Sequence, residues 1–375
     1  MSDLGDLLEL IHGAPLRYRT LDADVVERHR GEEKRRRVRL PVSPSRWPDR
    51  SVGYLKRAPW WRRRSRSRPP WWWRFERPRA SDAPFPELWD PSLLLTNYWL
   101  ETVGTTDHRG RPAIRVRAAD RDSPDDYARL ANRGEYELLV DPVLGIILRA
   151  ERIDGKEGVV WEVIDLEFDR HAWADEAPSA PEATGDMLEL MYLAKRNFRT
   201  IRATFASTPD GGRLGPNEAR VWFRSRWVWR AEEETEHGTQ LRIANEHRYW
   251  VSPPGGAVEA ARTSAEGFRH WYDPPYEEYW DPALLIPGLW FRPEGREPVG
   301  DRDAWRSAFA SRSTSDYWDP SFFDDLEEGT LHIDRDAGLI RQLSVLLDGG
   351  SFTTQLVDFE ADPELSDELF EYGGP

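Results

Sequence analysis

Hydrophobic and polar residues alternate along several stretches of the chain, and this pattern predicts strands with one buried face. In the second half these stretches are 200–207, 221–232, 240–251, 329–334, 339–347 and 351–359. In 221–231 one face carries Phe223, Trp227 and Trp229, while the other carries Arg224 and Arg226. We therefore expect Trp227 and Trp229 to be more buried than Arg224 and Arg226.

A helical spacing of apolar residues opens each half of the chain. It consists of Leu7, Leu8 and Ile11, and then of Met187, Leu188 and Met191. Each group predicts a short amphipathic helix. A second helix signal is the tripeptide Trp-Asp-Pro at 89–91 and 280–282, because Asp is a good N-cap and Pro is favoured at the first helical position.

The two halves are copies of one module. Residues 5–23 align without a gap on residues 185–203, and nine of the nineteen positions are identical. The pattern W-x-W-R-x-E follows at 71–76 and 227–232, then Trp-Asp-Pro, and then Asp141 and Gly145 match Asp334 and Gly338 at one common spacing. A repeat of this kind indicates one structural unit used twice. We expect modules at 1–175 and 184–375, joined by a linker rich in Pro, Ala and acids.

The spacing of the matched blocks shows where the copies differ. The first copy has an insertion at about 30–66, within a basic stretch, and the second has additional residues before Trp280, enough for a hairpin at 239–252. The segments 141–145 and 334–338 each lie between two alternating runs and predict hairpin turns. A calcium loop is disfavoured, because the Gly is one position early and position twelve holds no Glu.

Composition limits the chemistry. The 375 residues include no Cys, which excludes disulfides, thiol nucleophiles and Cys-ligated zinc. The eight His are scattered without metal-ligand spacing, and no Walker loop, G-x-S-x-G or G-x-G-x-x-G occurs. We therefore expect no cofactor, no metal and no catalytic residues. The acidic start does not resemble a secretory signal, and no apolar run is long enough to span a membrane, so we expect a cytoplasmic protein.

Charge is segregated along the chain. The net charge is -15, yet residues 28–79 hold 19 Lys and Arg against four Asp and Glu. The Trp-rich part of this stretch includes Arg62, Arg63, Arg64, Arg66 and Arg68. Arg with Trp suits an anionic membrane surface, and equally a single-stranded nucleic acid. The third interpretation is internal, with the arginines stacked on Trp and paired with acids of the same protein. The strongly acidic remainder argues against nucleic acid.

The order of these signals is that of a known family. A helix precedes an R-T-[LI]-x-A strand, W-R-x-E, a strand pair ending at 249–254, and late D-x-x-x-G-x-[IL] hairpins. This order resembles the LolA-type lipoprotein carrier or RseB-like superfamily, across nearly all of the second copy and a reduced form of the first. The carriers have a secretion signal, whereas none is visible at the start of this sequence.

The resemblance implies an α+β fold that is mostly antiparallel β. It comprises two tandem unclosed half-barrels, with helices covering the concave faces and an apolar cavity that takes acyl chains. On this basis the candidate ligand-binding residues are Trp99, Trp227, Trp229, Trp250 and Trp290. We expect a non-catalytic protein that binds a lipid, acyl chain or other apolar ligand. The alternatives are a protein-interaction module without a small ligand and an enzyme of unfamiliar arrangement.

Overall fold

The computed structural model describes most of the chain. The described residues are 3–41, 86–121, 134–156, 158–170, 184–209, 217–225, 227–262, 274–311, 328–347 and 350–373. They form two compact units, one around each of two antiparallel sheets. None of the described helices is long and apolar enough to cross a membrane.

The first sheet has seven strands in the order β2-β1-β7-β6-β5-β4-β3. Helices α1 (Asp3–His12) and α2 (Pro86–Trp89) accompany it, followed by the 3₁₀ helix η5 (Pro91–Thr96). Its strands are β1 (Tyr18–His29), β2 (Glu32–Pro41), β3 (Tyr98–His108), β4 (Arg111–Asp120), β5 (Tyr136–Val140), β6 (Ile147–Arg152) and β7 (Val160–Arg170).

The second sheet has eleven strands in the order β13-β12-β11-β10-β9-β8-β18-β17-β16-β15-β14. Its helices are α3 (Thr184–Leu193), η7 (Ala194–Asn197), α4 (Glu277–Trp280), η9 (Pro282–Leu285) and η10 (Asp367–Phe370). Its strands are β8 (Ile201–Pro209), β9 (Asn217–Ser225), β10 (Val228–Thr235), β11 (Gly238–Ala244), β12 (Arg248–Ser252), β13 (Glu259–Arg262), β14 (Leu289–Arg296), β15 (Ala304–Ser311), β16 (Glu328–Asp334), β17 (Ile340–Leu347) and β18 (Gly350–Ala361).

Seven strands follow the same order in both sheets. The run β9-β8-β18-β17-β16-β15-β14 repeats β2-β1-β7-β6-β5-β4-β3, strand for strand. Strand β2 begins inside the expected insertion, and it takes the place beside β1 that β9 takes beside β8. The second sheet then continues through β10, β11, β12 and β13. The expected hairpin at 239–252 is present as β11 and β12.

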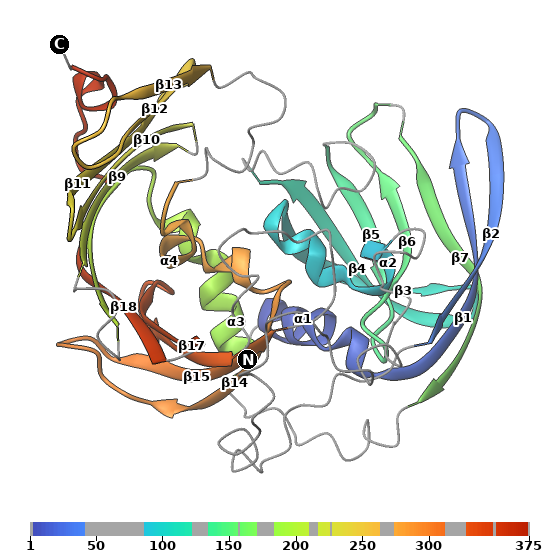
Figure 1. Ribbon diagram of the computed structural model, residues 1–375. Helices are drawn as coiled ribbons and strands as arrows, with labels where there is room; N and C mark the ends of the chain where they lie inside the picture. Colours follow the sequence, from blue (N-terminus) through green and yellow to red (C-terminus); the bar gives the residue numbers. More distant parts are fainter. Residues whose placement is uncertain are drawn as a thin grey trace, which may run out of the picture. The chain divides into compact units, whose positions relative to one another are not determined.

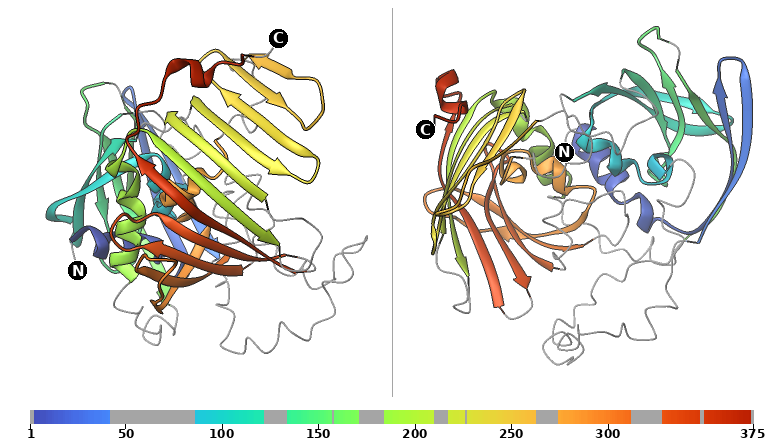
Figure 2. Two further views of the ribbon diagram at one scale, coloured as in Figure 1. Left: turned by 90° about the vertical axis from the view of Figure 1, so that its left-hand side faces the viewer. Right: turned by 45° about the horizontal axis from the view of Figure 1, so that its top comes forward.

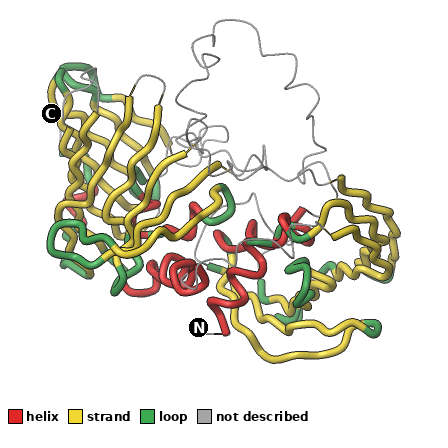
Figure 3. The backbone as a smooth tube through the Cα atoms, turned by 90° about the horizontal axis from the view of Figure 1, so that it is seen from below, coloured by secondary structure: helices red, strands yellow, loops and turns green. Residues whose placement is uncertain are grey.

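Both sheets are open and curved, as the fold class predicted. Figure 1 shows α2 inside the curve of the first sheet, and α3 and α4 inside the curve of the second. Figure 3 shows the same arrangement, with most helical segments on one side of each set of strands. An antiparallel sheet with one apolar face needs such a cover, because water would otherwise contact that face.

The two hairpin turns have one geometry. The Asp141 carboxylate accepts hydrogen bonds from the N–H groups of Val143 and Leu144 at 2.8 and 2.9 Å. The Asp334 carboxylate accepts hydrogen bonds in the same way from the N–H groups of Asp336 and Ala337 in the β16–β17 turn. Gly145 and Gly338 have φ angles of +74° and +71°. Side-chain capping by Asp and a left-handed Gly are standard turn chemistry. The sequence prediction of hairpin turns is therefore confirmed.

Two predicted strands, 221–232 and 240–251, are each interrupted. In the second, β11 ends at Ala244 and β12 begins at Arg248. The stretch 221–232 is not continuous, since β9 ends at Ser225 and β10 begins at Val228, with these two residues paired across a hairpin. Trp227 therefore lies in the turn. The sequence between Ser225 and Val228 contains none of the Gly, Asn, Asp or Pro residues that signal a hairpin. Alternation alone could not locate the break.

The Trp-Asp-Pro segments begin short 3₁₀ helices, as expected from their capping chemistry. Asp90 stands at the N-cap of η5 with Pro91 behind it, but its carboxylate accepts a hydrogen bond from the Ser92 hydroxyl at 2.5 Å instead of capping the backbone. Asp281 precedes η9 and forms an ion pair with Lys195. Both side chains thus contribute to tertiary contacts as well as to the helix start.

Candidate functional site

The helix-covered face of the second sheet is the candidate site. Phe205 of β8 identifies this face, because its ring contacts Tyr279 and Trp280 of α4 at centroid distances of 5.0 and 6.3 Å. Cross-strand partners share a face. The pairing of Ala203 with Val221, and of Ile201 with Phe223, therefore places β9 side chains on it too.

Aromatic rings dominate this face. The Phe205 ring stacks on Tyr276 at 4.4 Å, and Phe223 contacts the Trp280 ring at 5.4 Å. Phe205 and Trp280 are fully buried. Beyond β9, Trp229 of β10 continues the cluster and contacts Tyr249 of β12 at 5.9 Å. The cluster combines a large apolar area with a few polar atoms, a composition that suits contact with an apolar or amphiphilic ligand.

The indole N–H of Trp280 is a hydrogen-bond donor on this face that lacks a described acceptor. The Trp280 side chain has no exposed surface, and its Nε1–H has no acceptor among the residues that the structure describes. A buried donor without an acceptor costs about 1 to 3 kcal/mol. The face therefore holds a hydrogen-bond donor that a ligand oxygen could satisfy.

A cation with two carboxylates lies beside the aromatic cluster. The Lys195 ammonium, in η7, is 3.2 Å from the Glu277 carboxylate and 3.0 Å from that of Asp281. It also lies 5.9 Å from the centroid of the Phe223 ring. Both carboxylates are buried, where a charge requires an ion pair or hydrogen bonds. These ion pairs connect η7 to the α4 region and have a structural role.

The tyrosine hydroxyls of the cluster contact the sheet. Tyr279 donates a hydrogen bond to the Thr354 carbonyl at 3.2 Å, and the Ser207 and Thr354 hydroxyls are 3.0 Å apart. Burial raises the pKa of Tyr276, and the nearby Glu233 carboxylate adds to this effect. Every hydroxyl of this set therefore stays protonated near neutral pH and can act as a hydrogen-bond donor.

Two equivalent glutamates precede the Trp-Asp-Pro segments. Glu87 of α2 and Glu278 of α4 each stand two residues before the Trp. Burial raises the pKa of both carboxyls to about 7. For Glu278 the charge of Glu277 adds to the effect, whereas a hydrogen bond from its own backbone opposes it. Each short helix thus has an acid that changes charge near neutral pH.

The five candidate tryptophans do not share one site. Trp229 is fully buried on the helix-covered face, and Trp290 is buried in β14. Trp99 is half-buried in β3, where the Arg121 guanidinium lies 4.1 Å from its ring centroid. Trp250 is half-buried and lies on the opposite face of the second sheet, because its neighbour Tyr249 contacts Trp229. These positions separate the five side chains into core, outer surface and turn.

The prediction that Trp227 is more buried than Arg224 is wrong. Trp227 is 44% exposed at the β9–β10 turn, whereas Arg224 is only partly exposed. The hairpin break removes Trp227 from the strand face to which alternation had assigned it. Arg226 lies outside the described residues, as do Arg62, Arg63, Arg64, Arg66 and Arg68. Sequence reasoning missed Phe205, Tyr276 and Tyr279, although the aromatic residues directly before Trp280 were a usable signal.

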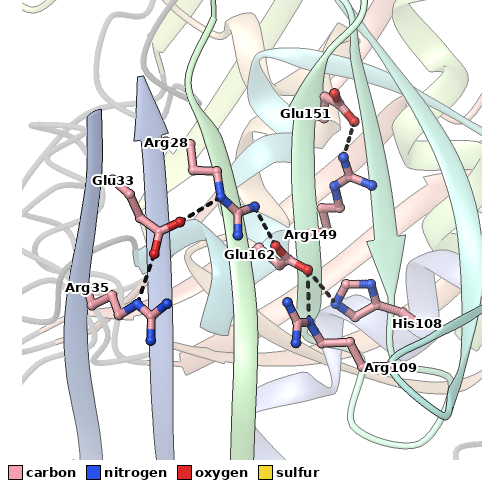
Figure 4. Close-up of polar contacts among 8 residues, drawn as sticks. All are labelled: Arg28, Glu33, Arg35, His108, Arg109, Arg149, Glu151 and Glu162. Atoms are coloured by element: carbon pink, nitrogen blue, oxygen red, sulfur yellow. Dashed lines mark hydrogen bonds and ion pairs between the residues drawn. The ribbon is translucent and has the colours of Figure 1, made fainter. Parts of the chain in front are cut away.

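The described beginning of the basic stretch forms ion pairs within its own sheet. Glu162 of β7 is 2.6 Å from Arg28 of β1 and 2.9 Å from Arg109, and His108 lies at 3.8 Å (Figure 4). Burial opposes ionisation of Glu162, but hydrogen bonds from Arg109 and Arg28 hold its pKa below the usual value. The guanidinium of Arg28 also contacts Glu33 at 3.1 Å.

Strand β2 repeats this pairing along its length. Arg37 and Arg39 are 2.7 and 2.8 Å from the two oxygens of Asp22, and they lower its pKa to about 2. For residues 32–41, the internal interpretation of the basic stretch therefore describes the contacts. In the part of the chain that the structure describes, no three acidic or His side chains are placed to hold a metal ion.

Comparison with known proteins gives structural likeness only. No protein-family model matches the chain, and no curated protein matches it. Among solved structures, the Pseudomonas aeruginosa MucA/MucB complex is similar at 20% identity, with a TM-score of 0.33 over 50% of this chain and 60% of that chain. This chain thus spans less than two thirds of MucB.

Two other similar structures are lipoprotein-related. The Mycobacterium tuberculosis lipoprotein LppX matches at 11% identity and a TM-score of 0.33, over 48% of this chain and 96% of its own. A putative outer membrane lipoprotein-sorting domain from Vibrio parahaemolyticus matches at 12% and 0.26, over 49% and 95%. These are the kinds of protein that the sequence order resembles. With TM-scores below 0.5, they add nothing to what this chain's own contacts show about function.

Proposed function

We propose that the protein is a non-catalytic binder of a lipid or other amphiphile, and that the ligand occupies the helix-covered face of the second sheet. The observation that supports this most is the buried Trp280 indole, which has no acceptor among the described residues and lies within a cluster of aromatic rings. An acyl chain would pack on those rings, and a carbonyl or carboxyl oxygen would accept the hydrogen bond.

The polar groups of this face suit binding better than catalysis. Lys195 is held by two carboxylates, and the Tyr279 hydroxyl is bound to a backbone carbonyl. The two carboxylates stabilise the charged ammonium of Lys195, whereas a nucleophilic lysine requires the neutral amine. These groups position the helices that cover the face, so the aromatic surface is what remains for a ligand.

Native mass spectrometry of the protein purified from its own host tests the proposal. We expect an additional mass of lipid size that is lost after extraction with organic solvent. A second measurement uses a fatty acid with a fluorescent group as the probe. The variant Trp280→Phe removes the N–H and should weaken probe binding about tenfold, because one hydrogen bond to a buried donor contributes about 1.4 kcal/mol.

The matched control is Trp222→Phe, which changes the opposite face of the same sheet and should leave probe binding unchanged. Equal probe binding by Trp280→Phe and the wild type would contradict the proposed site. Protein from its own host that holds a bound polypeptide in place of a lipid would replace the proposal with the protein-interaction alternative.

A further inference from the structure

The face of the second sheet opposite the helices has an aromatic and cationic surface of its own. Trp222, Arg230, Ile243 and Trp250 are successive cross-strand partners on β9, β10, β11 and β12, so they form one row, which we call the outer strip. The Arg230 guanidinium lies 5.8 Å from the Trp222 ring centroid. Ile243 is fully buried although it is on this outer face. Other residues therefore cover Ile243, whereas Trp222, Arg230 and Trp250 are half-buried.

The chain's own C-terminal segment lies on this surface. Figure 2 shows it on the side of the second sheet away from α3 and α4. Arg224, which follows the strip residue Trp222 on the same face, binds the Asp367 carboxylate at 2.5 Å and also donates to the Leu365 carbonyl. Arg230 donates to the Leu369 carbonyl at 3.2 Å. Two guanidinium groups thus bind an acidic turn.

Phe370 supplies the apolar part of the contact. It is 2% exposed, and the Arg224 guanidinium lies 4.9 Å from its ring centroid. Burial of this apolar ring is the main stabilising part of the contact. The ion pair adds less, because the Asp367 side chain is 89% exposed and water screens an exposed pair.

The residues at the start of the segment, Asp362 and Pro363, bind to Arg199 and Thr200 and not to the outer strip. The Asp362 carboxylate accepts hydrogen bonds from the N–H groups of Arg199 and Thr200 at 2.6 and 3.2 Å. The Thr200 hydroxyl donates to the Pro363 carbonyl at 2.9 Å. Residues 365–373 can therefore leave the outer strip without loss of these anchors at the end of β18.

We infer that the outer strip with Arg224 is a peptide-binding surface, and that the C-terminal segment occupies it in competition with a partner protein. The partner chemistry follows from the resident segment: an acidic peptide with a leucine followed by a phenylalanine. The guanidinium groups select carboxylates and carbonyl oxygens, and the Arg224 guanidinium also lies over the aromatic ring. The site is independent of the amphiphile site, because it lies on the opposite face of the sheet.

Competition between the two occupants makes the inference measurable. A tethered segment acts at an effective concentration of about 1 mM, so it blocks a free peptide of similar affinity. The probe is a fluorescent synthetic peptide of residues 363–373, and the readout is its anisotropy with the full-length protein. Full-length Asp367→Lys/Phe370→Ala releases the segment and should bind the peptide at least about tenfold more tightly than the wild type.

Three controls decide the outcome. Adding Arg224→Gln to the released variant should abolish tight binding, and a peptide with Phe370→Ala should not bind. If the double variant does not fold, Phe370→Ala alone serves as the released form. Equal peptide affinity for wild type and released protein would overturn the inference. So would tight binding that persists with Arg224→Gln.

Discussion

At the scale of single residues, Glu278 shows how burial sets a pH dependence. Its pKa is about 7, against an ordinary value of 4.5, and burial is the main cause. Between these two values the folded protein keeps the proton while the unfolded chain has lost it. The free energy of unfolding therefore falls as the pH rises through this window, and the loss is complete above pH 7.

Replacing the acid with an amide should remove this dependence. We expect Glu278→Gln to raise the free energy of unfolding by about 1 to 3 kcal/mol at pH 8, and to change it by less than about 0.5 kcal/mol at pH 5. Urea denaturation at the two pH values measures both. The exposed Glu364→Gln is the control and should have a small effect that is the same at each pH. A gain at pH 5 as large as at pH 8 would contradict the burial argument.

Trp229 and Trp227 form a matched pair for the core. Trp229 is fully buried and Trp227 is 44% exposed. Trp229→Ala should lower the free energy of unfolding by about 3 to 5 kcal/mol, and Trp227→Ala by less than about 1 kcal/mol. Denaturant unfolding monitored by circular dichroism gives both values. Similar losses for the two variants would show that the turn residue is packed as tightly as the core residue.

At the scale of elements, helix α1 packs closely against the β5–β6 turn because Gly145 of that turn has no side chain. A Cβ at Gly145 would lie 2.4 Å from the Leu10 carbonyl oxygen, and one at Gly338 would lie 2.1 Å from that of Leu190. Both contacts are with backbone atoms, which cannot rotate away. The same close approach of helix and turn therefore occurs in each copy of the module.

This contact can be separated from the backbone conformation itself. Gly145 and Gly110 have similar φ angles, +74° and +79°, but a Cβ at Gly110 would meet no atom within 4 Å. We expect Gly110→Ala to cost about 1 kcal/mol from its φ angle, and Gly145→Ala to cost about 2 to 4 kcal/mol because a clash is added. Thermal unfolding of the two variants measures the difference. Equal losses would show that helix α1 moves to accommodate the methyl group.

At the scale of the whole molecule, the described residues form two sheets that share one order of seven strands. The second sheet continues beyond these with four more strands. The additional strands β10 to β13 give the second sheet both its longer aromatic face and the outer strip. In the first unit, the described arginines of β2 are paired with acids of the same sheet. The remainder of the basic stretch lies outside the described residues.

We propose that this remainder contacts an anionic membrane surface. Each exposed cation there contributes about 1 kcal/mol, and salt screens the attraction. The full-length protein should sediment with anionic but not neutral liposomes at low ionic strength. Changing Arg62, Arg63, Arg64, Arg66 and Arg68 to Gln should abolish sedimentation without lowering the Tm. Absence of liposome binding together with a lower Tm in the variant would favour internal pairing, and tighter binding to single-stranded DNA would favour nucleic acid.

The sequence by itself determined the features that depend on neighbours along the chain. Alternation gave the strands at 200–207, 329–334, 339–347 and 351–359, because a pleated strand places every second side chain on one face. Asp141 and Gly145 gave the turn, since an Asp side chain and a left-handed Gly are local requirements. The matched motif blocks predicted one structural unit used twice, and the structure then shows a shared order of seven strands.

The tertiary structure alone decided which face of a strand meets helices and which meets solvent. Alternation separates two faces without saying what covers each, so Trp250 could not be assigned to the outer face, nor Phe205 to the inner one. The hairpin at Ser225 and Val228 has no turn residue to mark it. The Trp280 N–H lacks a described acceptor, and Glu278 has a raised pKa, because both groups are buried in the folded chain. Burial of this kind depends on tertiary packing.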